Sequence, residues 1–363
     1  MRCLDRIKLN LVTHEVLLKT TNLYYEMGKN HYYKQLFKAD LDHIKLEVAH
    51  KNAESFFKLF FSDFQVRDSR FRTLLLDSST PKNQSEHLYR NIVDVFRKIH
   101  VESGEPFNLL LGEIQDLTRI LFNNVLPPEK LKYRSTGKKK GMLISESSSM
   151  REELEAYLEA INKNDRKKEI EPVFLYVNFL VDFINMEVFN MPYNESLGIL
   201  IFYILILENN FDAANYVSFF AKLLYYKQDY QDIIRLVKMQ SEQDVPNLMP
   251  LMRFFINIFN TMYGDLEEFS RDYKYDQDLA INKTDYIENT ILKLPEVFSK
   301  ADIRKKHPSV SDSTINRTLS RLQEGNIIRS IGSGRSAKWV RIVAKDKKVK
   351  FEGQIMMDLG DKK

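Results

Sequence analysis

The stretch that most constrains the fold is residues 171–209, because two runs of apolar side chains are separated there by a short polar loop. In the first run only Asn178, Asp182 and Asn185 are polar, and their spacing places them on one face of a helix. The second run, residues 197–207, carries no charge. It is far shorter than the ~20 residues that cross a bilayer, which disfavours a transmembrane hairpin. The pattern therefore predicts two central helices of a soluble bundle.

Composition also favours a mainly α-helical protein with more than one domain. The 363 residues are enough for two or three domains, and 44% of them are hydrophobic. Cys3 is the only cysteine, which excludes a disulfide or a cysteine-based metal site within one chain. The N-terminal residues lack the long apolar core of a signal peptide. We therefore expect a cytoplasmic protein without membrane association.

Loops and charge shifts divide the chain into four segments. Turn-forming residues are dense at 77–85, and an acidic link occupies residues 263–283. We expect an N-terminal helical region at 1–84, a larger helical domain at 85–282, a small domain at 283–345 and a basic tail at 346–363.

The central hairpin resembles the core of the Fic family, whose signature reads F-x-x-I-H-P-F-x-[DE]-G-N-G-R. Without gaps, Phe183 takes the position of the first Phe, Met186 that of the Ile and Phe189 that of the second Phe, within a degenerate motif at 183–198. The resemblance implies a helical Fic-like domain. In the family, the His acts as the base for transfer of a nucleotide to a protein hydroxyl, and an acidic residue holds Mg²⁺.

The residues that carry this family chemistry are replaced. Glu187 stands at the His position and Met191 at the metal-ligand position, while Asn194 ends the segment that replaces Gly-Asn-Gly. Glu195 stands where the family has an Arg that clamps phosphate, so it would repel that group. We expect a Fic-like scaffold without catalysis, cofactor or metal, although activity with Glu187 as base stays open.

Two further segments extend the resemblance. Residues 114–121 match the family's I-x-x-L-H-x-x-L helix, with Thr118 in place of His. Tyr133-Arg134 match the start of the family's flap, which would occupy residues 133–148 here. We expect a protein partner, if there is one at this domain, to contact that flap.

Basic charge gathers near the C-terminus. Residues 298–345 contain eleven Lys and Arg against three Asp and Glu, a net charge of +8, so the remainder carries −4 of the total of +4. This distribution is typical of a nucleic-acid-binding domain. The pattern at 284–345 predicts three helices followed by strands at 327–331 and 337–343, with the second helix beginning at Phe298. This order resembles a winged helix-turn-helix.

The third of these helices has the composition of a DNA-reading helix. Ile315, Leu319 and Leu322 recur on one face and should be buried, and Ser311 is the expected N-cap. Asn and Arg side chains bind base edges, and hydroxyls bind phosphates. The expected DNA-binding residues are Ser313, Thr314, Asn316, Arg317, Ser320 and Arg321 on the helix, with Arg335 and Lys338 at the wing.

These observations favour a DNA-binding regulator in which an inactive Fic-like domain serves as scaffold, sensor or dimerisation body. The expected partners are double-stranded DNA and a second copy of the chain. Two alternatives stay open: a divergent Fic-type nucleotidyltransferase that modifies a protein hydroxyl, and a protein-interaction or antitoxin-like partner.

Overall fold

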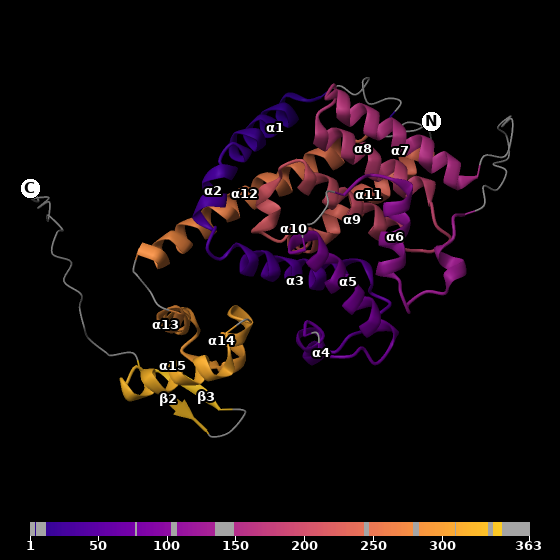
Figure 1. The fold of residues 1–363 in the computed structure, drawn as a ribbon. Coiled ribbons are helices and arrows are strands. Elements are labelled where there is room, and N and C mark those ends of the chain that lie inside the picture. Colours follow the sequence, from indigo (N-terminus) through magenta and orange to yellow (C-terminus); the bar gives the residue numbers. More distant parts are fainter. Residues whose placement is uncertain are drawn as a thin grey trace, which may run out of the picture. The chain divides into compact units, whose positions relative to one another are not determined.

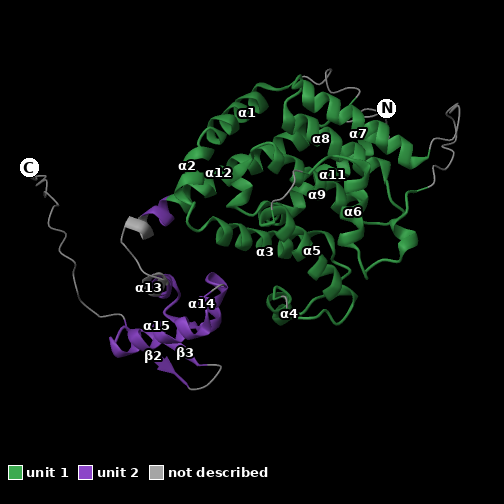
Figure 2. Cartoon of the chain, viewed as in Figure 1, with its two compact units in different colours: residues 1–270 green, residues 271–363 purple. Residues whose placement is uncertain are grey.

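The structure is a computed structural model of the chain. It describes residues 4, 12–76, 78–102, 107–134, 149–242, 247–278, 283–308, 310–332 and 337–342. Two compact units divide the chain, residues 1–270 and residues 271–363 (Figure 2).

The first unit is helical in its described residues, which confirms the mainly α-helical prediction. Short 3-10 helices, η2 (Pro128–Leu131) and η3 (Asp212–Asn215), connect some of the α-helices. The α-helices are, in order (Figure 1), α1 (His14–Met27), α2 (Asn30–Leu36), α3 (Leu41–Phe60), α4 (Asp68–Thr73), α5 (Gln84–His100), α6 (Leu111–Leu121), α7 (Met150–Lys167), α8 (Pro172–Met186), α9 (Asn194–Glu208), α10 (Phe219–Tyr225), α11 (Lys227–Glu242) and α12 (Met249–Asp278), the last of which extends past residue 270.

The predicted central hairpin is formed by α8 and α9. Glu171 caps α8, because its side chain accepts a hydrogen bond from the backbone N–H of Phe174. Most of the side chains on both helices are buried, and α8 also packs against α7 and α11. Of the polar residues on α8, Asn178 and Asp182 are buried, and Asp182 accepts a hydrogen bond from the Tyr157 hydroxyl at 3.0 Å. The hairpin is thus the core of the first unit.

The N-terminal helices share this core with the rest of the unit. Helix α3 packs against both α5 and α10. Aromatic rings fill the contact, and those of Phe56 and Phe220 meet edge to face with centroids 4.9 Å apart. Such pairs stabilise a core beyond the area they bury.

The second unit contains helices and a small sheet. Its elements are α13 (Lys283–Lys293), β1 (Val297–Ser299), α14 (Lys300–Lys306), α15 (Asp312–Glu324), β2 (Ile328–Ile331) and β3 (Lys338–Arg341). The three strands are antiparallel in the order β1-β3-β2, and Trp339 pairs with Phe298 on one side and Ser330 on the other. The order of helices, the two final strands and their pairing agree with the predicted winged-helix arrangement.

One boundary of that prediction was wrong. Phe298 and Ser299 belong to strand β1, and the second helix begins at Lys300. Ser299 is the N-cap of α14 and not a residue within the helix. Its backbone N–H donates to the Asp302 carboxylate in a capping box. The preceding residues are therefore free to pair with β3.

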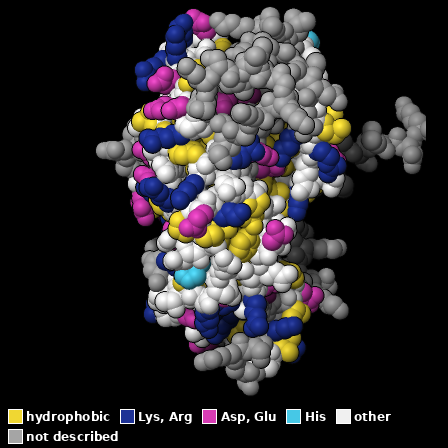
Figure 3. Space-filling view, turned by 90° about the vertical axis from the view of Figure 1, so that its right-hand side faces the viewer, with side chains coloured by type: hydrophobic (Ala, Val, Ile, Leu, Met, Phe, Trp, Pro, Cys, Tyr) yellow, Lys and Arg dark blue, Asp and Glu magenta, His cyan; other side chains and the backbone are white. Residues whose placement is uncertain are grey.

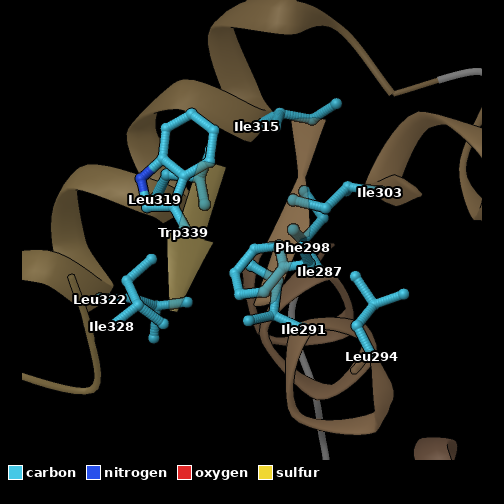
Figure 4. Close-up of a cluster of buried hydrophobic side chains, with 10 residues drawn as sticks. All are labelled: Ile287, Ile291, Leu294, Phe298, Ile303, Ile315, Leu319, Leu322, Ile328 and Trp339. Atoms are coloured by element: carbon cyan, nitrogen blue, oxygen red, sulfur yellow. The ribbon is translucent and has the colours of Figure 1, made fainter. Parts of the chain in front are cut away.

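The second unit has a hydrophobic core of its own. Ile315, Leu319 and Leu322 of α15 are buried in it as predicted, and the Ser311 side chain caps the helix by accepting from the Thr314 N–H. Figure 4 shows how side chains from α13, β1, α14, α15, β2 and β3 meet. The buried members are Ile287, Ile291, Leu294, Phe298, Ile303, Ile315, Leu319, Leu322, Ile328 and Trp339.

Candidate functional site

The loop between α8 and α9 contains the positions at which the Fic resemblance places its chemistry. Helix α8 ends at Met186, and Glu187 adopts a left-handed backbone with φ of 45°. Further along, the helices approach closely at Gly198, where an added Cβ would lie 3.0 Å from Phe183 Cδ1. The glycine therefore permits the tight crossing of α8 and α9.

The side chain of Asn194 occupies the inside of this loop. Its Oδ1 accepts from the Phe189 backbone N–H at 2.9 Å. Its Nδ2 donates to the backbone carbonyls of Phe189 at 2.9 Å and Met191 at 2.7 Å. Only 6% of Asn194 is exposed. Polar backbone groups of the loop are thus satisfied by the chain itself, and the Phe189 N–H is not free to bind a phosphate.

Glu187, at the position of the family's catalytic His, forms an ion pair with Arg134. The second guanidinium nitrogen of Arg134 donates to the Met186 carbonyl at 3.3 Å. Both charged side chains are substantially exposed, at 60% for Glu187 and 42% for Arg134. Glu187 therefore lies at the surface beside a cation and not in a buried site.

The start of the predicted flap lies against the same loop. The Arg134 backbone N–H donates to the Val188 carbonyl at 3.0 Å, and that of Asn190 donates to the Lys132 carbonyl at 3.1 Å. The ring of Tyr133 stacks on Phe189 with centroids 5.1 Å apart. This backbone pairing holds one edge of the loop, while the remainder of the flap, residues 135–148, falls outside the described residues.

The other two motif positions also lack phosphate or metal chemistry. Met191 is 6% exposed and offers no oxygen ligand for a hard cation. Glu195 accepts a hydrogen bond from the Lys238 ammonium at 2.7 Å. Among the residues that the structure describes, no cluster of three or more His, Cys, Asp or Glu side chains is placed to hold a metal ion.

Comparison with known proteins supports a Fic-like fold. The chain is similar to the crystal structure of a Fic family protein from Desulfovibrio desulfuricans G20, with a TM-score of 0.50 and 14% sequence identity. The similarity covers 93% of this chain and 99% of that chain. No family model matches the chain, and no curated protein matches its sequence. At this identity the likeness concerns the fold, and activity has to be argued from the residues themselves.

A second candidate site is the outer face of α15. Thr318, together with the three apolar residues, faces the core of the second unit. Thr314 is half-buried, and the predicted DNA-binding residues of the helix that are exposed are Ser313, Asn316, Arg317, Ser320 and Arg321.

Ion pairs fix some of the basic side chains around α15. Arg321 Nη2 lies 2.6 Å from Glu288 Oε2 on α13. Arg304 of α14 pairs with Asp312 at the start of α15. In the described part of the chain, by contrast, Asn316 and Arg317 have no hydrogen-bond or ion-pair partner. These two side chains are available to an external ligand.

The expected wing is described only in part. Lys338 begins β3 and is exposed, whereas Arg335 lies outside the described residues. The indole of Trp339 is largely buried, with the Lys300 ammonium 5.6 Å from its ring centroid. The side chain of Trp339 thus packs into the core of the second unit and is not presented to a partner.

Sequence reasoning missed a buried polar network in the first unit. Asn52 Nδ2 donates to the Tyr203 hydroxyl at 3.0 Å, and that hydroxyl lies 2.9 Å from His100 Nε2. Asn52 Oδ1 accepts from the Ser218 hydroxyl at 2.7 Å. Burial, with a smaller contribution from the positive charge of Lys45, lowers the pKa of His100 to about 3. These residues come from four separate segments of the chain. The one signal in the sequence is that each is a polar residue within an apolar stripe.

No helix in the described residues has the length and apolar character needed to cross a bilayer. On the face drawn in Figure 3, basic and acidic side chains are interspersed with exposed hydrophobic ones.

Proposed function

We propose that this protein is a DNA-binding regulator whose Fic-like domain does not catalyse nucleotide transfer. The observation that carries the proposal is the outer face of α15, where unpartnered Asn316 and Arg317 project from a helix with a buried apolar back. Asn pairs well with adenine and Arg with guanine in the major groove. Serine hydroxyls on the same face suit phosphate contacts.

The charge distribution supports the same proposal. The +8 charge of residues 298–345 supplies the sequence-independent attraction to a polyanion. Arg321 is ion-paired with Glu288. Among the described residues, Arg317 in the middle of α15 has no such partner. We therefore assign base reading to Asn316 and Arg317, and a backbone-contacting role to Arg321.

The central loop supports a non-catalytic role for the first unit. Asn194 forms hydrogen bonds with the Phe189 N–H and the Met191 carbonyl of the loop. The Met191 side chain is buried and offers no oxygen ligand for Mg²⁺. A thermal-shift titration with ATP and Mg²⁺ should leave the unfolding midpoint of the first unit unchanged. A saturable rise in that midpoint would instead favour nucleotide transfer.

The direct test begins with genome-wide mapping of the DNA bound by the full-length protein. A duplex recovered in this way is then titrated by fluorescence anisotropy. Arg317→Ala should weaken binding by about tenfold or more, since a bidentate base contact contributes roughly 1–3 kcal/mol of discrimination. The matched control is Arg235→Ala on α11, an exposed arginine whose partner is Asp232. Equal binding by both variants and the wild type would remove the assignment of α15.

A further variant separates the two arginines of α15. Glu288→Gln removes the ion pair between Arg321 and Glu288 and a negative charge near the proposed DNA surface. Affinity for the duplex should therefore rise, and the slope of log affinity against log salt should become steeper. A fall in affinity would show that the ion pair is needed to position α15.

A further inference from the structure

A pocket of about 360 Å³ lies at the end of the α8–α9 hairpin opposite the central loop. This volume is within the range of small-molecule sites. The start of α8 and the end of α9 line it, together with residues of α1, the end of α7 and α12. The apolar residues that line the pocket include Met27 and Phe259. The hairpin thus carries a cavity even though its Fic-like loop is filled.

The polar residues that line this pocket include two carboxylates. Asp165 and Glu171 are among the lining residues, and so are Lys168 and Asn209, the C-caps of α7 and α9. The C-terminal end of a helix carries partial negative charge on its unpaired carbonyls. The last turn of α9 contains no basic residue that would offset this charge. The carboxylates and the C-terminal end of α9 therefore favour a cation, whereas the N-terminus of α8 and the basic residues Arg166 and Lys167 in the last turn of α7 oppose one.

The two carboxylates differ in how far they are already engaged. Glu171 accepts from the Tyr24 hydroxyl at 2.9 Å and from the Phe174 N–H at 2.8 Å, one bond to each oxygen. Burial raises the pKa of Glu171. Asp165 accepts from the Tyr176 hydroxyl through Oδ1, and among the described residues no donor is bonded to its Oδ2. Asp165 is therefore the carboxylate with an acceptor left for a ligand.

We propose that this pocket binds a small organic monoamine, with the ammonium group at Asp165 and the C-terminal end of α9 and the apolar body against Met27 and Phe259. The ligand is positively charged at neutral pH, as alkylamines are. Lys168 is the one lysine or arginine among the lining residues, and it opposes the binding of a cation. The proposal concerns the first unit alone and does not depend on DNA binding.

The test is isothermal titration of the full-length protein with propylamine, hexylamine and 2-phenylethylamine. 2-Phenylethanol and 3-phenylpropionate serve as the matched neutral and anionic probes. At least one amine should bind saturably with one site per chain, and about tenfold more tightly than the alcohol or the acid, because a hydrogen bond to a charged group is stronger than a neutral one. The absence of saturable binding by all three amines, or equal binding of the acid, would overturn the proposal.

Two variants with opposite charge changes sharpen this test. Asp165→Asn should weaken binding of the amine by about tenfold. Lys168→Asn should strengthen it, and asparagine tolerates the left-handed backbone at this position, where φ is 51°. Asp116→Asn on the exposed surface of α6 is the control and should leave the affinity unchanged. If the affinity were the same in either pocket variant as in the wild type, the site would lie elsewhere.

Discussion

Three hydrogen bonds connect the side chain of Asn194 to the backbone of its own loop. They involve both polar groups of Phe189 and the carbonyl of Met191. Because the loop is buried at these atoms, each group would be costly to leave unpaired. One carboxamide therefore holds the shape of the loop and at the same time engages the Phe189 N–H, a donor that a phosphate would need.

This role predicts a large effect of Asn194→Ala. Three buried backbone groups lose their partner, so the free energy of unfolding should fall by about 2–4 kcal/mol. The matched control is Asn190→Ala in the same loop, where the side chain is exposed, and its effect should stay within about 0.5 kcal/mol. Chemical denaturation of both variants measures the difference. Similar small effects would mean that the loop keeps its shape without the side chain.

His100 makes stability dependent on pH. Its pKa is about 3 in the folded chain and about 6.5 when unfolded. Below pH 6.5 the unfolded state binds a proton that the folded state does not bind until the pH approaches 3, so stability falls as pH drops through this window. Between pH 7.5 and 5.0 the contribution lost is about 2 kcal/mol.

The variant His100→Gln tests this linkage. It lacks the titrating group, so its unfolding free energy should decline less steeply over this pH range than that of the wild type. Denaturant unfolding at several pH values measures both slopes. The comparison of slopes does not depend on how much the substitution destabilises the chain at neutral pH. Parallel slopes would show that His100 does not carry the effect.

At the scale of elements, the crossing of α8 and α9 sets the geometry of the first unit. Gly198 brings α9 against Phe183, Leu180 and Ile184 of α8. Burial of apolar side chains stabilises the contact between the two helices. Gly198 has no side chain, and this permits the short distance between them.

Two glycine substitutions separate packing from helix propensity. Gly198→Leu must displace Phe183 and should destabilise the protein by about 1–3 kcal/mol. Gly264→Ala lies in α12 where nothing is within 4 Å of the added Cβ, and it should stabilise the helix by up to about 1 kcal/mol. Thermal unfolding followed by circular dichroism detects both changes. A neutral effect of Gly198→Leu would mean that the hairpin can open at no cost.

At the scale of the whole molecule, the two units have separate cores. The ten buried side chains that form the hydrophobic cluster of the second unit all lie between residues 287 and 339. The basic charge is concentrated in the same segment. Folding and the proposed DNA binding of this unit thus have their determinants within residues 271–363.

A fragment of residues 271–363 should therefore unfold cooperatively by itself. Leu319→Ala in the fragment should lower its unfolding free energy by about 2–5 kcal/mol, because the side chain is buried in that core. Circular dichroism during heating measures both. A fragment without a cooperative transition would show that this core depends on the first unit.

Much of the fold could be predicted because it follows from local patterns. The apolar run at 171–209 specifies two buried helices, and the spacing of Ile315, Leu319 and Leu322 specifies the inward face of α15. Strand β1 was missed because its three residues form a strand only by pairing with β3, about forty residues further along the chain.

The sequence by itself therefore determined the helical class and the central hairpin, since each depends on neighbouring residues in the chain. Tertiary structure decided which polar groups are engaged. Arg134 meets Glu187 across 53 positions, and Arg321 meets Glu288 across 33. The pocket between α1, α7 and the hairpin likewise exists only once distant helices pack. The physical reason is that hydrogen bonds and cavities depend on distances between side chains, and long-range packing sets those distances.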